Sequence, residues 1–256
     1  MSEFTYISEA GNSRLNMNQD AVLARQNDVA GLFVVADGMG GTKDGDRASR
    51  LIVKMMEQWW QQEEANMTTL WFEDAVEDLK DKLLEANHAI LQTTEPGTMT
   101  GSTVVLLFIL QKQYALLWAG DSRCNVYTRE KSRIRREQLS IDDVWQNSER
   151  LTRGLSKDEI RHHRQYGRLI KAIGIKEQLR LNVRIGKIQS PSLFTLQSDG
   201  IYKYVKEDMV DRSCVLALGD GNLERAMQTV RTAVYNAGAR DNLSMILIRT
   251  EGYRNE

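Results

Sequence analysis

The sequence is poor in proline and cysteine, with two of each among 256 residues. Because no stretch rich in Pro, Ser and Gly interrupts the chain, one domain over residues 1–256 is the simplest organisation. Cys124 and Cys214 lie far apart, which argues against a disulfide scaffold and favours buried or incidental thiols in a reducing compartment. We therefore expect a cytoplasmic protein.

Long hydrophobic runs and an excess charge of one sign are also missing. The longest apolar stretch, Thr103–Leu110, has the length of a strand and is well below the roughly 18 residues of a membrane span. The 34 Lys and Arg nearly balance the 35 Asp and Glu, so no global charge points to nucleic acid or a membrane as partner. The N-terminus also lacks the basic and apolar segments of a secretory signal.

What the chain does contain is a set of periodic apolar segments that predict a mixed α+β fold with antiparallel sheet. Strands that follow one another directly are expected to pair antiparallel, because parallel strands need long crossovers. A charge-dense segment at about 130–167 is expected to form an irregular or partly helical, flap-like insertion. The other predicted elements are strands at 3–8, 20–25 and 31–36, helices at 48–65 and 70–92, three strands within 101–129, a hairpin of strands from 181–188 and 192–200, a helix at 223–238 and a last strand at 242–250.

Five aspartates stand at strand ends or next to glycine, and four of them directly precede or follow a predicted strand and are flanked by Gly, Ser or Asn. If the strand ends converge, their carboxylates repel one another unless hard cations lie between them. Zinc patterns such as Cys-x-x-Cys are missing, and all-oxygen ligands favour Mg²⁺ or Mn²⁺. Two such ions, about 3.5–4 Å apart, can clamp a phosphoryl group. The aspartates are Asp20, Asp37, Asp121, Asp199 and Asp241.

The stretch "FVVADGMGG" places three glycines directly behind Asp37, which suggests a backbone that must come close to another group. Asp37 could bridge two ions, and Gly38 could offer its backbone carbonyl. Arg14, six residues before Asp20, could bind a phosphate with its guanidinium fork. Taken singly, each motif is more often a turn or a solvated side chain, so the ordered set carries the prediction.

That ordered set resembles bacterial members of the metal-dependent protein phosphatases, the PPM or type 2C family. The resemblance extends over nearly the whole chain. It is carried by "GNSRLNMNQD", "VVADGMGGTKDGDRAS", "TGSTVV", "WAGDSRCNVY", "RLIKAIG", "LFTLQSDGIYKYV" and "GARDNLSMILI".

The resemblance implies a central antiparallel β-sandwich flanked by helices, with a two-metal site at one end. It implies that phosphoserine or phosphothreonine is hydrolysed by metal-activated water, and that the partners are phosphorylated proteins, including a Ser/Thr kinase and its targets. By the same resemblance, Asp37 bridges the two metals, Gly38 is a ligand through its carbonyl, and Asp199 and Asp241 bind the second metal. Asp20 holds metal-bound water, and Asp121 contributes to a third, weaker metal site. Arg14 binds the phosphate.

Two positions depart from the family pattern. Thr42 and Asp143 stand where bacterial members usually carry histidine, which leaves the group that protonates the leaving alkoxide open. Two other functions remain possible at this point: an inactive regulatory module with the same fold, or an enzyme for small phosphate esters. Substrate selection is expected in the 130–167 segment, where Arg161, Arg164 and Arg168 could meet an acidic or phosphorylated partner.

Overall fold

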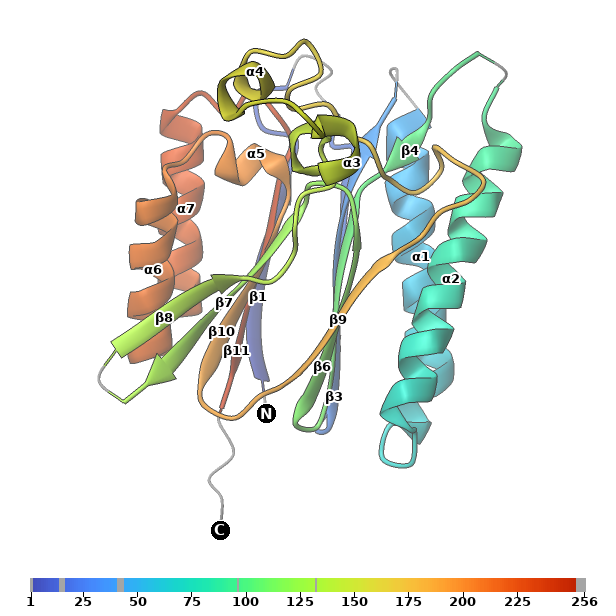
Figure 1. Cartoon of the computed structure of the whole chain (residues 1–256). Helices are drawn as coiled ribbons and strands as arrows, with labels where there is room; N and C mark the ends of the chain where they lie inside the picture. The colour runs from blue at the N-terminus through green and yellow to red at the C-terminus, as the bar shows by residue number, and fades with distance from the viewer. Residues whose placement is uncertain (1, 14–16, 41–43, 96, 132, 252–256) are drawn as a thin grey trace.

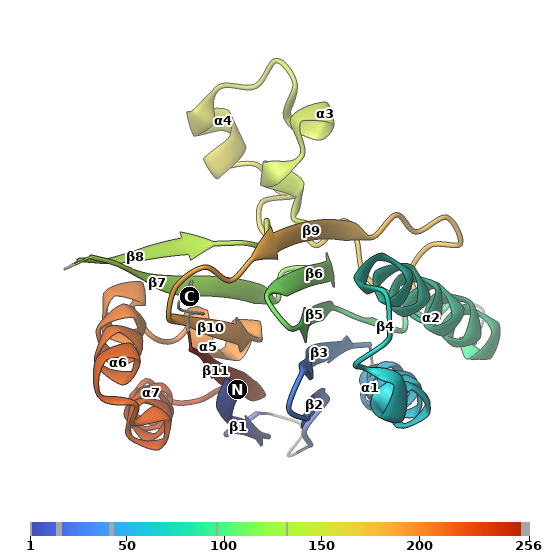
Figure 2. The same cartoon turned by 90° about the horizontal axis from the view of Figure 1, so that it is seen from below.

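The computed structural model describes residues 2–13, 17–40, 44–95, 97–131 and 133–251. Two antiparallel sheets pack face to face, and helices cover both outer faces (Figure 1). Seen from below, the layers follow the order helices, sheet, sheet, helices (Figure 2). The predicted α+β fold with a central sandwich is therefore confirmed.

The first sheet has five strands in the order β1-β11-β10-β7-β8. The second has the order β2-β3-β5-β6-β9, with the short β4 paired to β3, and all pairs in both sheets are antiparallel. The strands are β1 (Ser2–Glu9), β2 (Asp20–Gln26), β3 (Ala30–Met39), β4 (Gly101–Ser102), β5 (Val104–Leu110), β6 (Gln113–Ala119), β7 (Arg123–Glu130), β8 (Arg133–Gln138), β9 (Asn182–Lys187), β10 (Ser192–Gln197) and β11 (Leu243–Thr250).

Two long helices pack on each outer face. The pair α1 and α2 covers the six-stranded sheet, and the pair α6 and α7 covers the five-stranded sheet (Figure 2). The helices are α1 (Asp44–Glu63), η1 (Glu64–Asn66), α2 (Phe72–Thr93), η2 (Trp145–Asn147), α3 (Glu149–Thr152), α4 (Lys157–Arg161), α5 (Asp199–Tyr202), α6 (Glu207–Asp220) and α7 (Leu223–Asn236).

The central strands are buried on both faces, which explains their unbroken apolar sequence. On β5, Leu106 and Phe108 point toward α1 and α2, whereas Val105 and Leu107 point into the space between the sheets. A strand covered on both sides needs apolar residues at every position, because successive side chains face opposite layers. Trp59 of α1 meets Phe108 edge-on, with ring centroids 5.5 Å apart.

The predicted hairpin of 181–188 and 192–200 is wrong. β9 pairs with β6 and β10 pairs with β7 and β11, so the two strands belong to different sheets. Likewise, β6 pairs with β5, but β7 crosses to the other sheet, so the three predicted strands of 101–129 do not form one meander. Neighbours in sequence need not be partners when a chain alternates between two layers.

The segment predicted as an irregular insertion at 130–167 begins with a regular edge strand, β8, which pairs with β7. The charges of "RIRREQ" hid this strand from the sequence prediction, and such charges are typical of exposed sheet edges. The irregular part is residues 145–168, here called the flap, and it contains η2, α3 and α4. The flap lies at the level of the upper sheet ends in Figure 1 and projects outward beyond the edge strands β8 and β9 in Figure 2.

The flap leaves and re-enters the domain at one narrow base. A bridge joins Val144 to Leu169, and the Trp145 N–H donates to the Arg168 carbonyl at 2.8 Å. Inside the flap, the rings of Trp145 and His163 are stacked, with centroids 4.1 Å apart and planes 5° from parallel. Elsewhere, among the described helices, none is long and apolar enough to cross a membrane.

Candidate metal centre

Two of the predicted site aspartates face each other across the β2–β3 pair. The antiparallel register places Asp20 directly opposite Asp37. On β3, Phe33 and Val35 point between the sheets, so strand alternation turns Asp37 to that side as well. Asp20 is 5% exposed, whereas Asp37 keeps partial access to solvent. Both carboxyls therefore lie at the rim, the end of the sandwich where β2 begins and β3 ends.

The other three aspartates come from segments around the five-stranded sheet. Asp199 opens α5 directly after β10, Asp241 precedes β11, and Asp121 lies in the turn from β6 to β7. The Ser198 hydroxyl donates to Asp20 Oδ2 at 2.8 Å, which brings the end of β10 against β2. The structure thus gathers all five predicted aspartates at one rim.

Repulsion within this cluster shows in the carboxyl pKa values. Burial, reinforced by the charges of Asp199 and Asp241, raises the pKa of Asp20 to about 7. Burial and the charges of Asp20, Asp199, Asp121 and Asp241 raise the pKa of Asp37 well above its ordinary value. Burial followed by the charge of Asp199 likewise raises the pKa of both Asp121 and Asp241. Such a cluster holds more negative charge than its surroundings offset.

Lys203 supplies part of the missing positive charge. Its ammonium forms an ion pair with Asp199 one helical turn away, and the side chain is half exposed. Burial alone would lower the pKa of Lys203, but the charge and hydrogen bond of Asp199 outweigh it and leave that pKa raised. The sequence analysis did not single out this lysine, although its i,i+4 spacing from Asp199 could have signalled the pair.

Two of the glycines after Asp37, Gly38 and Gly40, are required by close backbone packing. A Cβ on Gly38 would lie 2.2 Å from the Gly45 carbonyl oxygen and 2.7 Å from that of Gln19. Gly40 has φ of +133°, a conformation that only glycine adopts readily. The backbone that approaches here is the start of α1, where Ser49 donates to the Gln19 carbonyl at 2.5 Å. The structure thus explains Gly38 by its packing against the start of α1 and Gln19. It explains Gly40 by its φ angle and by the Met99 carbonyl oxygen, 2.9 Å from where a Cβ would lie.

Asn242 fixes the N-terminal segment against the cluster, a role that the sequence analysis missed. It accepts from the Gln19 N–H at 2.9 Å and donates to the carbonyls of Ala10 and Met17, both at 2.9 Å. Its amide also lies 3.3 Å from the Ser13 hydroxyl. The predicted phosphate ligand Arg14 lies outside the described residues. Ser13 before it and Met17 after it both contact Asn242, the residue that follows Asp241.

A polar chain that sequence analysis also missed supports Asp121. The Tyr202 hydroxyl donates to the Asp121 carbonyl at 3.1 Å, and the Arg123 guanidinium lies 3.6 Å from the centre of the Tyr202 ring. Arg123 in turn forms a two-pronged ion pair with Asp142, with a shortest distance of 2.7 Å. The "DSR" of the β6–β7 turn therefore positions Asp121 through its arginine.

Asp143, one of the two departures from the family pattern, joins the flap base to the same turn. One of its oxygens accepts from the Gly120 N–H at 3.0 Å and from Asn182 at 2.8 Å, and the other pairs with Lys171 at 2.9 Å. A carboxylate is an effective acceptor for these three donors. Thr42, the second departure, lies outside the described residues.

The donor set fits hard divalent cations. It consists of carboxylate oxygens, and bound cations would relieve the repulsion that raises the pKa values of Asp20, Asp37, Asp121 and Asp241. Among the described residues, however, no three Asp, Glu, His or Cys side chains are already arranged as a ligand set for one ion. The fold therefore concentrates negative charge at this rim, but the described side chains are not yet arranged as the ligands of one ion.

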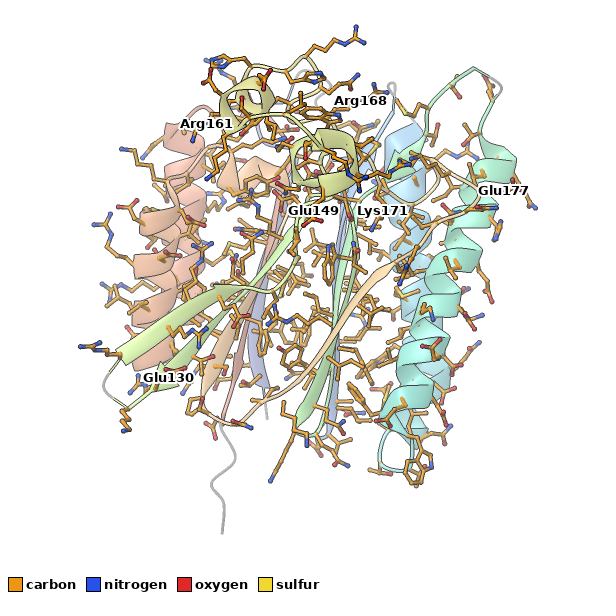
Figure 3. The ribbon with its side chains drawn as sticks, viewed as in Figure 1. Glu130, Glu149, Arg161, Arg168, Lys171 and Glu177 are labelled. Carbon is orange, nitrogen blue, oxygen red and sulfur yellow. The ribbon has the colours of Figure 1, made fainter. Side chains whose placement is uncertain are left out.

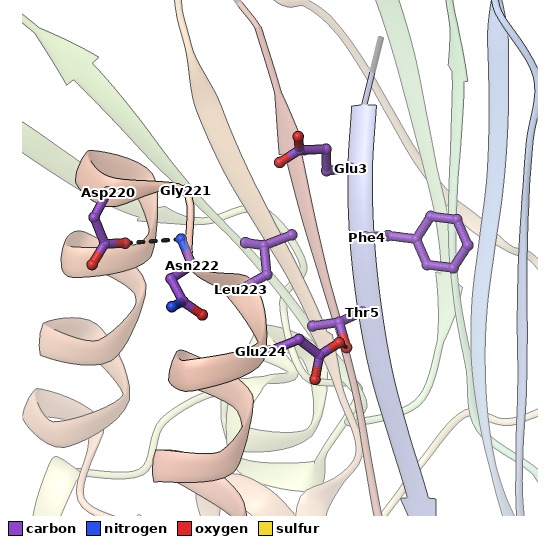
Figure 4. Close-up of a pocket in the computed structure, with 8 residues that line it drawn as sticks. All are labelled: Glu3, Phe4, Thr5, Asp220, Gly221, Asn222, Leu223 and Glu224. Atoms are coloured by element: carbon purple, nitrogen blue, oxygen red, sulfur yellow. Dashed lines mark hydrogen bonds between the residues drawn. The ribbon is translucent and has the colours of Figure 1, made fainter.

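A separate hollow of about 450 Å³ lies between the start of β1 and the α6–α7 turn (Figure 4). Its carboxylates already have partners: Glu224 accepts from Thr5 at 2.5 Å, and Glu3 pairs with Arg249 at 3.0 Å. Asp220 accepts from the Asn222 N–H at 2.9 Å, drawn as a dashed line in Figure 4. This acidic hollow is therefore part of the helix–strand packing and not a second aspartate cluster.

A family model described as Protein phosphatase 2C matches residues 12–247. The chain belongs to the protein phosphatase 2C family. Members of this family depend on metal ions, and the chain is a phosphoprotein phosphatase. The family resemblance expected from the sequence is thus confirmed.

Named relatives agree with this family over almost the whole chain. The protein phosphatase PhpP of Streptococcus pneumoniae is 26% identical over 250 residues, covering 96% of each chain. The crystal structure of the serine/threonine phosphatase Stp1 from Staphylococcus aureus has a TM-score of 0.78 and 25% identity, covering 98% of this chain and 96% of that one. The catalytic domain of the serine/threonine protein phosphatase PstP, solved with two manganese ions, has a TM-score of 0.74 at 20% identity, covering 96% of this chain and 97% of that one.

Proposed function

We propose that this phosphatase hydrolyses phosphoserine and phosphothreonine in proteins by using two Mg²⁺ or Mn²⁺ ions held at the rim. The observation that carries the proposal is the gathering of five carboxylates, four with raised pKa values, at one end of the sandwich. When bound, such ions activate water for attack on phosphorus and offset the charge of the phosphoryl group.

The proposed metal ligands come from both sheets. Asp37, at the centre of the cluster, is the proposed bridging ligand, and Gly38 offers its carbonyl beside it. Asp199 and Asp241 complete the second site from the other sheet. Their proposed roles are supported by the charges that each places on its neighbours.

Asp20 and Asp121 are proposed in supporting roles. Asp20, held by Ser198, would orient water next to the ions. Asp121 is partly exposed, is positioned by Tyr202, and would take part in a third and weaker ion site. A carboxylate that is oriented by neighbouring hydrogen bonds holds such a position well.

Arg14 is the proposed phosphate ligand. It lies outside the described residues, so the support comes from its neighbours Ser13 and Met17, which both contact Asn242. An arginine can present its fork to two phosphate oxygens at once.

We further propose a Ser/Thr kinase and its targets as partners, because the named relatives are serine/threonine phosphatases. A cytoplasmic location is proposed as well, on the basis of two free and buried thiols, Cys124 and Cys214. A regulatory module without activity is the alternative, and the presence of all five aspartates speaks against it.

The test is phosphate release from a phosphothreonine peptide with EDTA, Mg²⁺ or Mn²⁺. We expect release only when metal is added. Absence of release with every metal, while calorimetry still detects metal binding, would favour the regulatory module. Release that persists in EDTA would contradict the two-metal proposal.

A further inference from the structure

A groove of about 920 Å³ lies between the flap and the chain that follows it, residues 172–180. Met39, the last residue of β3, also lines it. This groove, here called the flap groove, does not contain the site aspartates.

The charge of the lining has one sign. None of the residues that line the flap groove is Asp or Glu. Within the described residues, only Lys171 of its cations forms an ion pair, with Asp143 at 2.9 Å. The cations that line it are Arg150, Arg168, Lys171, Lys176 and Arg180. Of the three arginines singled out in the sequence, Arg168 alone lies here.

Apolar side chains line the same groove. Met99 is 67% exposed, and Leu155 and Leu179 also line the groove. Trp145, stacked on His163, gives it a rigid wall. A surface with exposed methionine and separated positive charges suits a peptide with both apolar and acidic side chains better than a uniformly polar polyanion.

The groove starts at the aspartate rim. Met39 follows Asp37 by two residues on the same strand. Lys171 is bound to Asp143, which accepts from the Gly120 N–H next to Asp121. Figure 3 labels Arg168 and Lys171 on the flap side of the molecule, far from Glu130 at the other end. A phosphorylated side chain at the rim would therefore carry its flanking residues into the groove.

We propose that the flap groove binds the segment flanking the phosphorylated residue and selects segments that carry acidic and apolar side chains. This inference rests on the proposed function, because it names the substrate class of the same site. The cations contribute through charge attraction that salt screens, so the selection weakens as ionic strength rises.

The experiment compares two phosphothreonine peptides of equal length, one with Asp, Glu and Leu beside the phosphothreonine and one with Lys and Ser. For the wild-type protein with Mn²⁺, we expect kcat/KM to favour the acidic peptide by about tenfold at low salt. In the double variant Arg150→Glu and Arg180→Glu, the preference should disappear or reverse. The matched control, Arg133→Glu and Arg135→Glu, has the same change of charge on β8 and should keep the preference.

An equal kcat/KM for both peptides in the wild type, or an unchanged preference in the groove variant, would overturn the proposal. Hydrolysis of p-nitrophenyl phosphate, which has no flanking peptide, separates loss of selection from loss of catalysis. If neither peptide nor this ester is hydrolysed, the proposed function fails on its own account. Fluorescence anisotropy of a labelled acidic peptide then still tests the groove. Peptide binding by the wild type that is lost in the Arg150→Glu and Arg180→Glu double variant would support the groove proposal. Equal binding by the wild type and this variant would refute it.

Discussion

Asp20 and Asp37 stand directly opposite each other on neighbouring strands, and both carboxyls have raised pKa values. Like charges in directly opposed strand positions destabilise a sheet. In the absence of cations, the fold therefore carries an unfavourable interaction at the place where its chemistry is proposed, and this has consequences that can be measured.

Replacement of Asp37 by Asn should abolish turnover while preserving the fold. The substitution removes the central carboxylate and relieves its repulsion with Asp20, so metal-free stability should be equal or higher. We expect phosphate release to fall by at least about 10²-fold. Phosphate release and thermal unfolding are the measurements, and Asp78→Asn, an exposed change on α2, is the control. A rate near that of the wild type would rule out Asp37 as the bridging ligand.

The metal-free protein should lose stability as the pH rises from about 4 to 7. The pKa of Asp20 is about 7 in the folded protein, against about 3.9 in an unfolded chain, so the folded state binds more protons in this window. Stability is therefore greatest below the window and declines through it, by on the order of 2–4 kcal/mol for Asp20.

Urea unfolding in EDTA at pH 5 and pH 8 measures this difference. Mn²⁺ should stabilise the protein more at pH 8 than at pH 5, because carboxylates must be ionised to bind it. Asp20→Asn should flatten the pH dependence. Greater metal-free stability at pH 8 than at pH 5 would contradict the assignment of Asp20.

Gly200→Ala should strongly destabilise the protein. A Cβ at Gly200 would lie 1.8 Å from the Asn242 carbonyl oxygen, so α5 and the start of β11 would have to separate. We expect a loss of about 3 kcal/mol in the free energy of unfolding. Gly219→Ala is the matched control within a helix, since its nearest neighbour would be 3.6 Å away and Ala favours helix by up to about 1 kcal/mol. Equal denaturation midpoints for the two variants would show that the contact is absent.

Asp143→Ala should loosen the base of the flap. It leaves the Gly120 N–H without its acceptor and removes the ion-pair partner of Lys171, which keeps its hydrogen bond to Asn182. We expect a cost of about 1–3 kcal/mol. Trypsin should then cleave the arginine-rich flap faster, whereas Asp143→Asn, which keeps an acceptor, should show a smaller effect. Asp158→Ala, an exposed change on α4, controls for the lost charge. Unchanged cleavage in Asp143→Ala would mean that the flap is held elsewhere.

The parts of the fold that could be predicted are those that depend on residues close together in the sequence. The apolar run of β5 and the aspartates at strand ends follow from strand alternation and from polar residues at turns. The convergence of these aspartates was predicted because a strand end is a rigid and accessible position. Strand alternation sufficed for β5, whereas the aspartate site was predicted from the ordered set of motifs and the family resemblance that this set carries.

The parts that could not be predicted depend on distant partners. Nothing local in β9 and β10 shows that they join different sheets, and the charged residues of β8 resemble a loop. The contacts of Ser198 with Asp20 and of Asn242 with Gln19 join residues that are 178 and 223 positions apart. Only Lys203, four residues after Asp199, had a local signal.

The hydrogen bond from Ser198 to Asp20 joins the two sheets at the rim. Asp20 and Asp37 belong to the six-stranded layer, whereas Asp199 and Asp241 adjoin the other, so their repulsion pushes the two layers apart at the rim. Cations bound at the rim would offset this repulsion and hold the two layers together. When the cations leave, the two layers should separate at the rim before they separate elsewhere.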